Sequence, residues 1–338
     1  MNSRLIEFDL LKLYAIFLVI WGHIIQYFLS SVFYDEPVYR FIYSFHMPLF
    51  MMISGFFSYS SMSLKWNYFI KKKIVQLLLP SFSWGIILWI WHLYYSFLNE
   101  NVDCSLHHLI QILFFDFWFL KSCFLCYLLA YFGVNYVKGN YTWIIVTIVF
   151  SLFFPYYQMW IMYPCFIIGQ LLKKNAGFIC SIKKLYLLCA LLFVVMQLFW
   201  DKTFWIHDCS LFDAVFGLII KKDFSFMLLW SYRLYRLSIG IIGSFLFIGI
   251  FCKWFTINNC SFISRISEYG KYTLEIYVLQ VLIIEEILSR YVNFDNQGFV
   301  LFNFFISPIL SIVFILLCVS FVKQIRKSSF RLLLFGKF

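Results

Sequence analysis

The amino-terminal stretch of residues 4–23, RLIEFDLLKLYAIFLVIWGH, constrains the fold most strongly, because a charged run passes directly into an apolar helix that carries a histidine. Lys12 and His23 are eleven residues apart, so on a helix they share one face at a separation of about 16.5 Å along the axis. If this helix spans a bilayer, Lys12 lies at one surface and His23 lies near or just past the midplane. An imidazole at that depth indicates either a functional group or a structural histidine bonded to a neighbouring helix. His23 alone leaves both readings open.

The composition places the chain in a membrane. Of its 338 residues, 63% are hydrophobic and only 13% are charged, whereas soluble domains carry roughly 25% charged residues. Residues 10–32 are too long for the apolar core of a signal peptide, and no small-residue cleavage site follows them. We therefore expect them to be retained as the first membrane span.

The apolar stretches predict an all-α integral membrane protein, a polytopic bundle of about ten transmembrane helices. These stretches lie near residues 10–32, 42–60, 75–98, 117–137, 141–157, 159–172, 184–200, 234–252, 272–289 and 300–322. Most of the 27 Lys and Arg residues fall in the turns and tails of one side, which the positive-inside rule assigns to the cytoplasm together with both termini. The net charge of +11 therefore reflects membrane topology, and no nucleic-acid partner is expected.

No stretch reads as a soluble domain, so we expect residues 1–338 to form one transmembrane domain. The run LFDAVFGLII at residues 211–220 is amphipathic and predicts a short helix on the outer surface. Cys123 and Cys126 form a CxxC inside an apolar helix, without a second pair or a histidine cluster, so no metal site is expected. Cys104 and Cys209 fall in loops on the same side, and nothing in the sequence supports a disulfide between them.

The second span contains FHMPLFMMISGFF, in which Pro48 removes a helix hydrogen bond beside His46. Farther along, Ser54 and Gly55 are small enough for another helix to approach closely. This pattern fits a simple kink with a packing notch. A second buried imidazole near a kink also fits a functional site.

Other candidates carry similar alternatives. Lys71, Lys72 and Lys73 could hold a phosphate-bearing cofactor, or they could serve only as topology determinants. Trp118 in FDFWFLKS is either an interfacial aromatic or a site residue. Arg233 and Arg236, near the outer surface, could bind an acidic sugar or simply snorkel.

The ninth span opens YGKYTLEIYVLQ and is more polar than its neighbours, which favours a place inside the bundle. Glu275 follows Lys271 at the i, i+4 spacing, so an intrahelical ion pair would satisfy it. Gln280 lies farther along the same helix.

A histidine three turns above a basic residue suggests acyl transfer. A phosphate-tailed acyl donor could anchor its nucleotide on cytosolic cations and extend a pantetheine arm of the order of 16.5 Å to His23. Histidine can deprotonate a hydroxyl at near-neutral pH. The acceptor would then reach the site from the other side of the membrane.

These residues resemble the acyltransferase 3 family of integral-membrane O-acyltransferases. The first helix of that family carries a basic residue and, after ten residues, a histidine, often with an aspartate before them; Asp9, Lys12 and His23 match this pattern. The stretch FHMPLFMMISGFF resembles the second helix of the family. The WFL at residues 118–120 resembles a motif in a later helix, and GKYTLEIYVLQ resembles the family's late helix G-x-T-L-x-I-Y-x-x-H.

The sequence departs from the family at two places. Two arginines often precede the proline of the third helix of the family, where this chain has Lys73 and Gln76. The late helix of the family often ends in histidine, where this chain has Gln280. The first departure affects the donor contacts, and the second indicates that Gln280 is not the base.

The resemblance implies acetyl-CoA as donor and a hydroxyl of a cell-envelope saccharide as acceptor, in the cytoplasmic membrane. In this interpretation His23 is the general base, His46 assists it, and Asp9 orients the cytosolic end. Donor-binding residues would be Lys12, Lys71, Lys72 and Lys73, and acceptor-binding residues Trp118, Arg233, Arg236, Glu275 and Gln280. Many relatives carry an extra extracytoplasmic hydrolase-like domain. Without one, the protein would act alone or with a separate extracytoplasmic transferase.

The main alternative is a transporter or flippase, since ten spans, buried ionisable groups and a kinked helix are also compatible with transport. The sequence shows neither paired hydropathy halves nor an intramembrane series of acids beyond Glu275. A non-catalytic assembly factor is disfavoured by the combination of Lys12 and His23 with His46 and Pro48. Catalysis predicts release of free CoA thiol, whereas transport does not.

Overall fold

The computed structural model describes residues 5–29, 33–99, 105–139, 141–154, 156–174, 183–201, 203–206, 211–220, 222, 225–257, 261–295 and 298–336. Within these ranges the chain is built from helices and contains no strand. The longer helices are α1 (Ile6–Phe28), α2 (Pro37–Ser58), α4 (Leu79–Asn99), α6 (Trp118–Tyr136), α8 (Met159–Lys174), α10 (Lys183–Leu198), α13 (Ser225–Ile257) and α17 (Ser307–Ile325). The shorter α-helices are α3 (Trp66–Lys73), α5 (Leu106–Phe115), α7 (Thr142–Phe153), α11 (Thr203–Ile206), α12 (Leu211–Ile220), α14 (Ser261–Ser267), α15 (Thr273–Gln280), α16 (Phe299–Leu301) and α18 (Arg331–Phe335).

Several helices are extended by tighter or wider turns. The 3₁₀ segments are η1 (Phe33–Asp35), η2 (Tyr59–Ser61), η4 (Glu268–Tyr272) and η6 (Leu288–Arg290). The π-helical segments are η3 (Ile74–Leu78), η5 (Val281–Ile287) and η7 (Phe302–Ile306). Single π turns inside helices are frequently associated with functional sites, and η3 and η5 both border the cavities described below.

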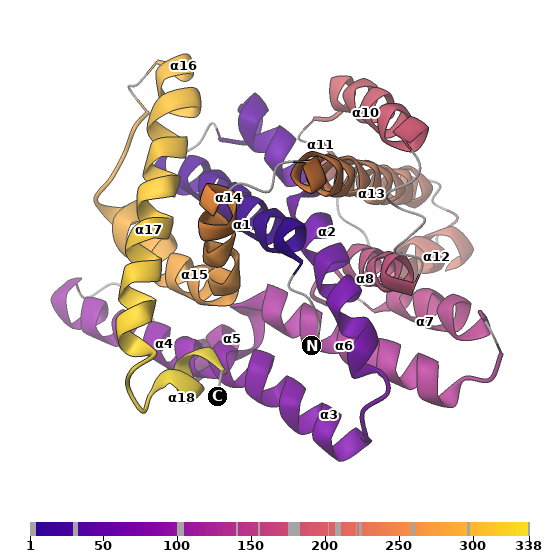
Figure 1. Ribbon diagram of the computed structural model, residues 1–338, viewed down its shortest axis with the longest axis horizontal. Helices are drawn as coiled ribbons and strands as arrows, with labels where there is room; N and C mark the ends of the chain where they lie inside the picture. Colours follow the sequence, from indigo (N-terminus) through magenta and orange to yellow (C-terminus); the bar gives the residue numbers. More distant parts are fainter. Residues whose placement is uncertain are drawn as a thin grey trace.

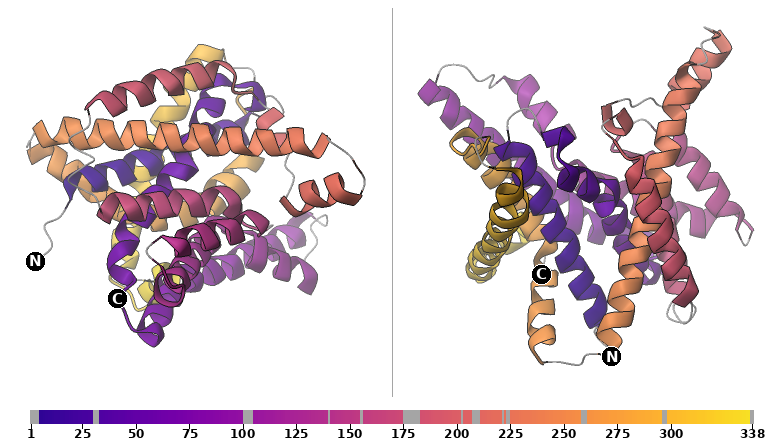
Figure 2. Two further views of the ribbon diagram at one scale, coloured as in Figure 1. Left: turned by 90° about the vertical axis from the view of Figure 1, so that its right-hand side faces the viewer. Right: turned by 90° about the horizontal axis from the view of Figure 1, so that it is seen from above.

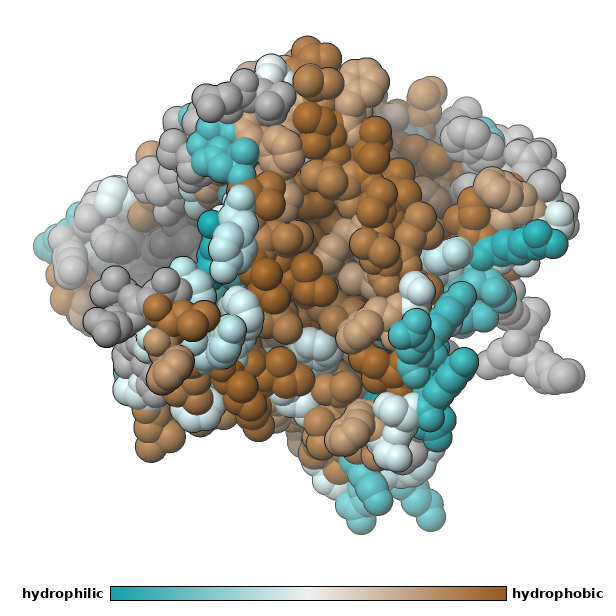
Figure 3. All heavy atoms as spheres, turned by 90° about the vertical axis from the view of Figure 1, so that its left-hand side faces the viewer, coloured by the Kyte–Doolittle hydropathy of each residue, from teal (hydrophilic) through white to brown (hydrophobic). Residues whose placement is uncertain are grey.

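The predicted all-α, polytopic membrane fold is confirmed. In the described ranges, six helical segments are long and apolar enough to cross a bilayer: Ile6–Phe28, Pro37–Ser61, Trp66–Leu98, Trp118–Tyr136, Met227–Lys253 and Phe299–Ile325. Leu106–Phe115, Thr142–Phe153 and Tyr186–Leu198 are shorter apolar helices. Figure 3 shows hydrophobic side chains across the middle of one face, with hydrophilic ones gathered along its two lateral margins. This banding is the pattern that a bilayer imposes on a protein surface.

Helices α1 and α2 lie in the middle of the bundle, with α17 on one side and α13 and α10 on the other (Figure 1). The long helix α13 crosses the whole molecule (Figure 2) and packs on α2. A Cβ built on Gly240 of α13 would lie 2.6 Å from Cγ of Pro48, so the proline of α2 sits directly against this helix. Helix α2 nevertheless continues as one α-helix through Pro48.

The predicted notch at Gly55 is confirmed as a site of close helix packing. A Cβ on Gly55 of α2 would lie 1.9 Å from the carbonyl oxygen of Phe166 in α8, and a Cβ on Gly169 of α8 would lie 1.9 Å from that of Met52. The two backbones therefore touch where neither helix has a side chain, as small residues allow in membranes.

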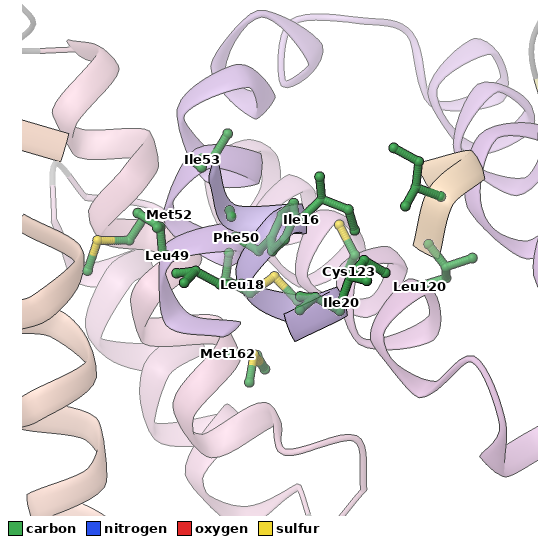
Figure 4. Close-up of a cluster of buried hydrophobic side chains, with 14 of the residues drawn as sticks. Ile16, Leu18, Ile20, Leu49, Phe50, Met52, Ile53, Leu120, Cys123 and Met162 are labelled. Atoms are coloured by element: carbon green, nitrogen blue, oxygen red, sulfur yellow. The ribbon is translucent and has the colours of Figure 1, made fainter. Parts of the chain in front are cut away.

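The apolar core fills the space between α1, α2, α6 and α8, where Ile16, Leu18, Leu49, Phe50 and Cys123 gather (Figure 4). These helices are thereby fixed relative to one another around the polar residues that they carry. Close packing of these buried side chains keeps the four helices in fixed positions.

Both ends of the described chain lie at the same end of the bundle, here called the inner end. Gly270 approaches the backbone of Asp9 near the start of α1. At the other end of the chain, Gly336 approaches the backbone of Val75. The inner end also carries Lys12, Lys73 and Arg326, so it is the end that the positive-inside rule predicts to be cytoplasmic. The opposite end is called the outer end. Cys104 and Cys209 lie outside the described residues.

Candidate active site

The outer half of the bundle contains a cavity of about 400 Å³, here called the outer cavity. Its lining combines aromatic, amide, imidazole and charged side chains from α1, α2, α13, α15, η5, the start of α6 and the segments just before α6 and α8. The lining residues used below are Val19, His23, Gln26, Tyr27, Tyr43, His46, Met47, Phe115, Asp116, Phe117, Trp118, Gln158, Arg236, Tyr277, Gln280 and Glu285. A mainly aromatic pocket with a few convergent polar groups is the usual form of a small-molecule site.

A carboxylate lies beside His23. The Nδ1 atom of His23 lies 3.3 Å from Oε1 of Glu285, without the alignment of a formed hydrogen bond. The other carboxylate oxygen, Oε2, accepts a hydrogen bond of 2.9 Å from the Tyr27 hydroxyl. Such contacts in unliganded sites often tighten only when substrate binds. The carboxylate is placed to orient the imidazole with Nδ1 protonated, which leaves Nε2 as the basic nitrogen.

The π-helical turn η5 explains how Glu285 reaches this position. The Nε2 atom of Gln280 donates a hydrogen bond of 2.8 Å to Oε1 of Glu285, a contact between residues five apart. In an α-helix, residues five apart point in different directions, whereas a π-helix has an i→i+5 repeat. The neighbouring Glu286 faces elsewhere, 2.9 Å from Nε2 of His92 and 2.8 Å from a guanidinium nitrogen of Arg290.

Sequence reasoning missed Glu285. The signal was present as EE within the apolar run VLIIEEIL, because an acid inside a predicted span is by default a functional candidate. The orientation of Glu285 could not be predicted from the sequence, because an α-helical projection does not place Glu285 on the same face as Gln280.

His46 belongs to the same cavity. Its Nδ1 lies 2.8 Å from the carbonyl oxygen of Ile42, and because a carbonyl only accepts, Nδ1 carries the proton and Nε2 is the free acceptor. The ring of Tyr43 lies between the two imidazoles, with centroids 4.5 Å from His46 and 6.4 Å from His23. The Tyr43 hydroxyl donates to Gln26 at 2.7 Å. The structure thus brings both predicted histidines to one site.

A second cavity of about 190 Å³, here called the inner cavity, lies toward the inner end. It shares Val19, Met47 and Tyr277 with the outer cavity, so these side chains form the wall between the two. Val19 precedes His23 by four residues, about 6 Å along the helix axis. The inner cavity therefore approaches His23 from the inner side.

Lys73 lines the inner cavity and is 5% exposed. Its ammonium lies 3.4 Å from the centroid of the Tyr127 ring, and among the described residues it has no carboxylate partner. A buried cation without a counter-ion is costly in a membrane protein. An anionic ligand at this cavity would lower that cost.

The other predicted donor-binding residues do not line either cavity. Lys12 lies 3.2 Å from Asp9 and 4.0 Å from the ring centroid of Phe57. Asp9 is about 21 Å from His23 along the axis of α1, so it holds Lys12 and is remote from the imidazole. Lys71 is exposed and Lys72 half-buried at the inner end.

Of the predicted acceptor-binding residues, Trp118, Arg236 and Gln280 line the outer cavity. Arg233 and Arg236 both lie over the ring of Trp160, at 4.7 and 5.4 Å from its centroid, and Arg233 is not part of the cavity lining.

Glu275 lies elsewhere. It is fully buried and bonded to Arg326 of the carboxy-terminal segment, while Lys271 pairs with Glu268 at 3.6 Å. Lys271 lies in the 3₁₀ turn η4 and Glu275 in the helix α15 that follows it. The pairs that the structure shows for them are therefore Lys271–Glu268 and the long-range Glu275–Arg326.

Comparison with known proteins identifies the family of the chain. Residues 5–323 match the model of the Acyl_transf_3 family, described as an acyltransferase domain. The nodulation protein NolL of Mesorhizobium japonicum is 33% identical over 132 residues, which cover 38% of this chain and 35% of that protein. The NolL of Sinorhizobium fredii is 34% identical over 134 residues, covering 38% of this chain and 36% of that protein. The chain thus matches little more than a third of the length of either relative.

No solved structure matches the chain. The family match, in contrast, extends over nearly all of it and includes His23, His46 and Glu285. The protein therefore belongs to the Acyl_transf_3 family of acyltransferase domains.

Proposed function

We propose that this multi-pass membrane protein is an O-acetyltransferase that moves an acetyl group from cytosolic acetyl-CoA to a hydroxyl of a cell-envelope saccharide. The observation that carries the proposal is the placement of a carboxylate-paired histidine, His23, in a cavity that adjoins a second, lysine-bearing cavity. Each cavity would take one substrate, and the reacting atoms would meet near His23.

The donor would enter from the inner end. Its thioester arm would occupy the inner cavity, with Lys73 supplying positive charge for the anionic part of the donor. Lys12, Lys71 and Lys72 would add a less specific positive potential at the mouth. The wall formed by Val19, Met47 and Tyr277 has to open for the thioester to reach His23; methionine is well suited to this because its side chain is flexible.

The acceptor would enter from the outer end and place one hydroxyl at Nε2 of His23. The imidazole removes the hydroxyl proton as the oxygen attacks the thioester carbonyl, and Glu285 stabilises the imidazolium that forms. The carbon–sulfur bond then breaks, and the departing thiolate takes the proton from His23. The products are an acetyl ester and free CoA thiol, with no net proton change. His46 would position the acceptor or assist the proton transfer.

The same features support assignment to the cytoplasmic membrane, where cytosolic acetyl-CoA and an envelope saccharide or its lipid-linked precursor are both within reach. A separate extracytoplasmic transferase would be a second acceptor of the acyl group. A transporter remains the alternative, since a cavity bearing polar groups also suits solute passage.

The test is release of CoA thiol from acetyl-CoA by purified protein in proteoliposomes, with and without envelope saccharide on the opposite side. Saccharide-dependent thiol release is expected. Saccharide movement without thiol release would support the transporter and contradict the proposal.

A further inference from the structure

Two breaks with left-handed backbone conformation meet at the wall of the outer cavity. Phe117, just before α6, has a φ of 51°, and Tyr157 and Gln158, just before α8, have φ values of 56° and 51°. None is glycine, and side chains other than glycine and asparagine rarely adopt this conformation. Strained residues of this kind persist only where the surrounding structure holds them, and they cluster at functional sites.

The two breaks are bonded to their surroundings. The hydroxyl of Tyr157 donates a hydrogen bond of 2.8 Å to the carbonyl oxygen of Phe114, across from one break to the other. The buried ammonium of Lys121 bonds to the carbonyl oxygen of Asp116. These bonds hold the backbone just before Phe117, and the second ties it to α6.

The turn at Phe117 changes which side chains the cavity receives. Four consecutive residues, Phe115 to Trp118, all line the outer cavity. Consecutive residues of a regular helix point about 100° apart, so an uninterrupted helix could not turn all of them to one wall. The break therefore presents Asp116 and Trp118 together, and the second break adds Gln158 to the same lining.

Asp116 lines the outer cavity but has no role in the acyl transfer described above. No described residue donates a hydrogen bond to its carboxylate, and the ammonium of Lys121 bonds to its backbone carbonyl oxygen. Burial raises the pKa of Asp116 above its ordinary value, and the ammonium of Lys121 is the strongest influence against that shift. A half-buried carboxylate in a cavity is satisfied best by hydroxyl donors from a ligand.

We propose that Asp116, Trp118 and Gln158 form the sugar-binding subsite of the outer cavity, and that it recognises a neutral pyranose ring through neighbouring hydroxyls. This proposal rests on the proposed transferase function and names the class of its acceptor. The two carboxylate oxygens of Asp116 accept from adjacent hydroxyls, the Trp118 indole packs on the C–H face of the ring, and the Gln158 amide bonds a further hydroxyl. A uronic acid carboxylate beside Asp116 would be repelled.

The test compares acetyl transfer to methyl glucopyranoside and methyl glucuronide at high concentration by wild-type protein, Asp116→Asn and Asp295→Asn. Asp295 is an exposed carboxylate of the outer end that lies outside the cavity lining, so its variant is the matched control. We expect wild type to favour the neutral glycoside. Asp116→Asn should raise the KM for that glycoside about tenfold or more, which is the loss expected for a charge-assisted hydrogen bond. The affinity for acetyl-CoA should not change. Asp295→Asn should match wild type in both measurements.

Trp118→Leu supplies a second, independent variant and should raise the same KM. Three outcomes would overturn the subsite and leave the transferase function standing. The first is a preference for the glucuronide. The others are CoA release with envelope saccharide but with neither glycoside, and an unchanged KM in Asp116→Asn. If Asp116→Asn lowered both the affinity for acetyl-CoA and the thermal stability of the protein, the carboxylate would have a structural role, and the subsite would be overturned as well. Absence of CoA release under every condition would overturn both proposals.

Discussion

The Nδ1 atom of His23 in α1 lies 3.3 Å from Oε1 of Glu285 in the π-helical turn η5. The same carboxylate is bonded by Tyr27 and Gln280, so α1 and the continuous α15–η5 segment meet at this carboxylate. This network places a carboxylate beside Nδ1 of His23, and a contact that tightened on substrate binding would favour the tautomer with Nδ1 protonated. It is also the part of the site that links the two ends of the chain.

Replacing Glu285 by glutamine should lower kcat by about 10²-fold, within the range attributed to general acid–base groups, because the amide keeps the shape of the side chain but cannot stabilise an imidazolium. Acetyl-CoA affinity should be retained. Glu286→Gln is the matched control, because its carboxylate contacts His92 and Arg290 on another side of the helix. Equal losses of kcat in the two variants would indicate a general effect on η5 and contradict the pairing of Glu285 with His23.

Lys73→Met should weaken acetyl-CoA binding about tenfold, as expected for loss of a charged contact, and the difference from wild type should shrink at high salt. Lys71→Met tests the same charge change on the same helix, at an exposed position outside the inner cavity. Calorimetric titration with acetyl-CoA measures both. A larger effect from Lys71→Met would place the donor outside the inner cavity.

Gly55→Ala should destabilise the protein by about 1–3 kcal/mol or more, the usual cost of overpacking, because the new Cβ would meet the Phe166 carbonyl at 1.9 Å. Gly298→Ala provides the control, since a Cβ there has no neighbour within 4 Å. Thermal unfolding in detergent compares the two variants. A Gly55→Ala protein as stable as Gly298→Ala would show that α2 and α8 are not in close backbone contact.

Arg326→Met should leave the buried Glu275 without its partner and lower stability by up to about 3–5 kcal/mol. The partial exposure of Arg326 reduces this cost through solvent. Adding Glu275→Gln should recover part of the loss, because the unpaired charge disappears. If the double variant is no more stable than Arg326→Met, the pair is not what anchors the carboxy-terminal segment.

Much of this architecture follows from the sequence because hydropathy and helix length dictate it. The ten apolar stretches all contain helices, the amphipathic run at 211–220 forms α12, and the small residues at Gly55 mark a helix contact. His23 and His46 share a cavity as the spacing and the kink suggested. These features depend on local periodicity, which one chain displays directly.

The remaining parts depend on departures from regular helices. Glu285 reaches His23 through a π turn, and Asp116 reaches the cavity through the left-handed Phe117. Glu275 bonds to Arg326 of the carboxy-terminal segment, far away in the sequence. None of these arrangements follows from α-helical spacing, because each is set by tertiary packing that overrides it.

The role of His23 is tested by acetyl-CoA titration by calorimetry combined with acetyl transfer to envelope saccharide, for wild type and His23→Gln in proteoliposomes. We expect saturable binding of similar affinity to both proteins, with transfer reduced in His23→Gln by a factor of about 10²–10⁴. Transfer at the wild-type rate by well-folded His23→Gln would contradict the assignment of His23 as the base.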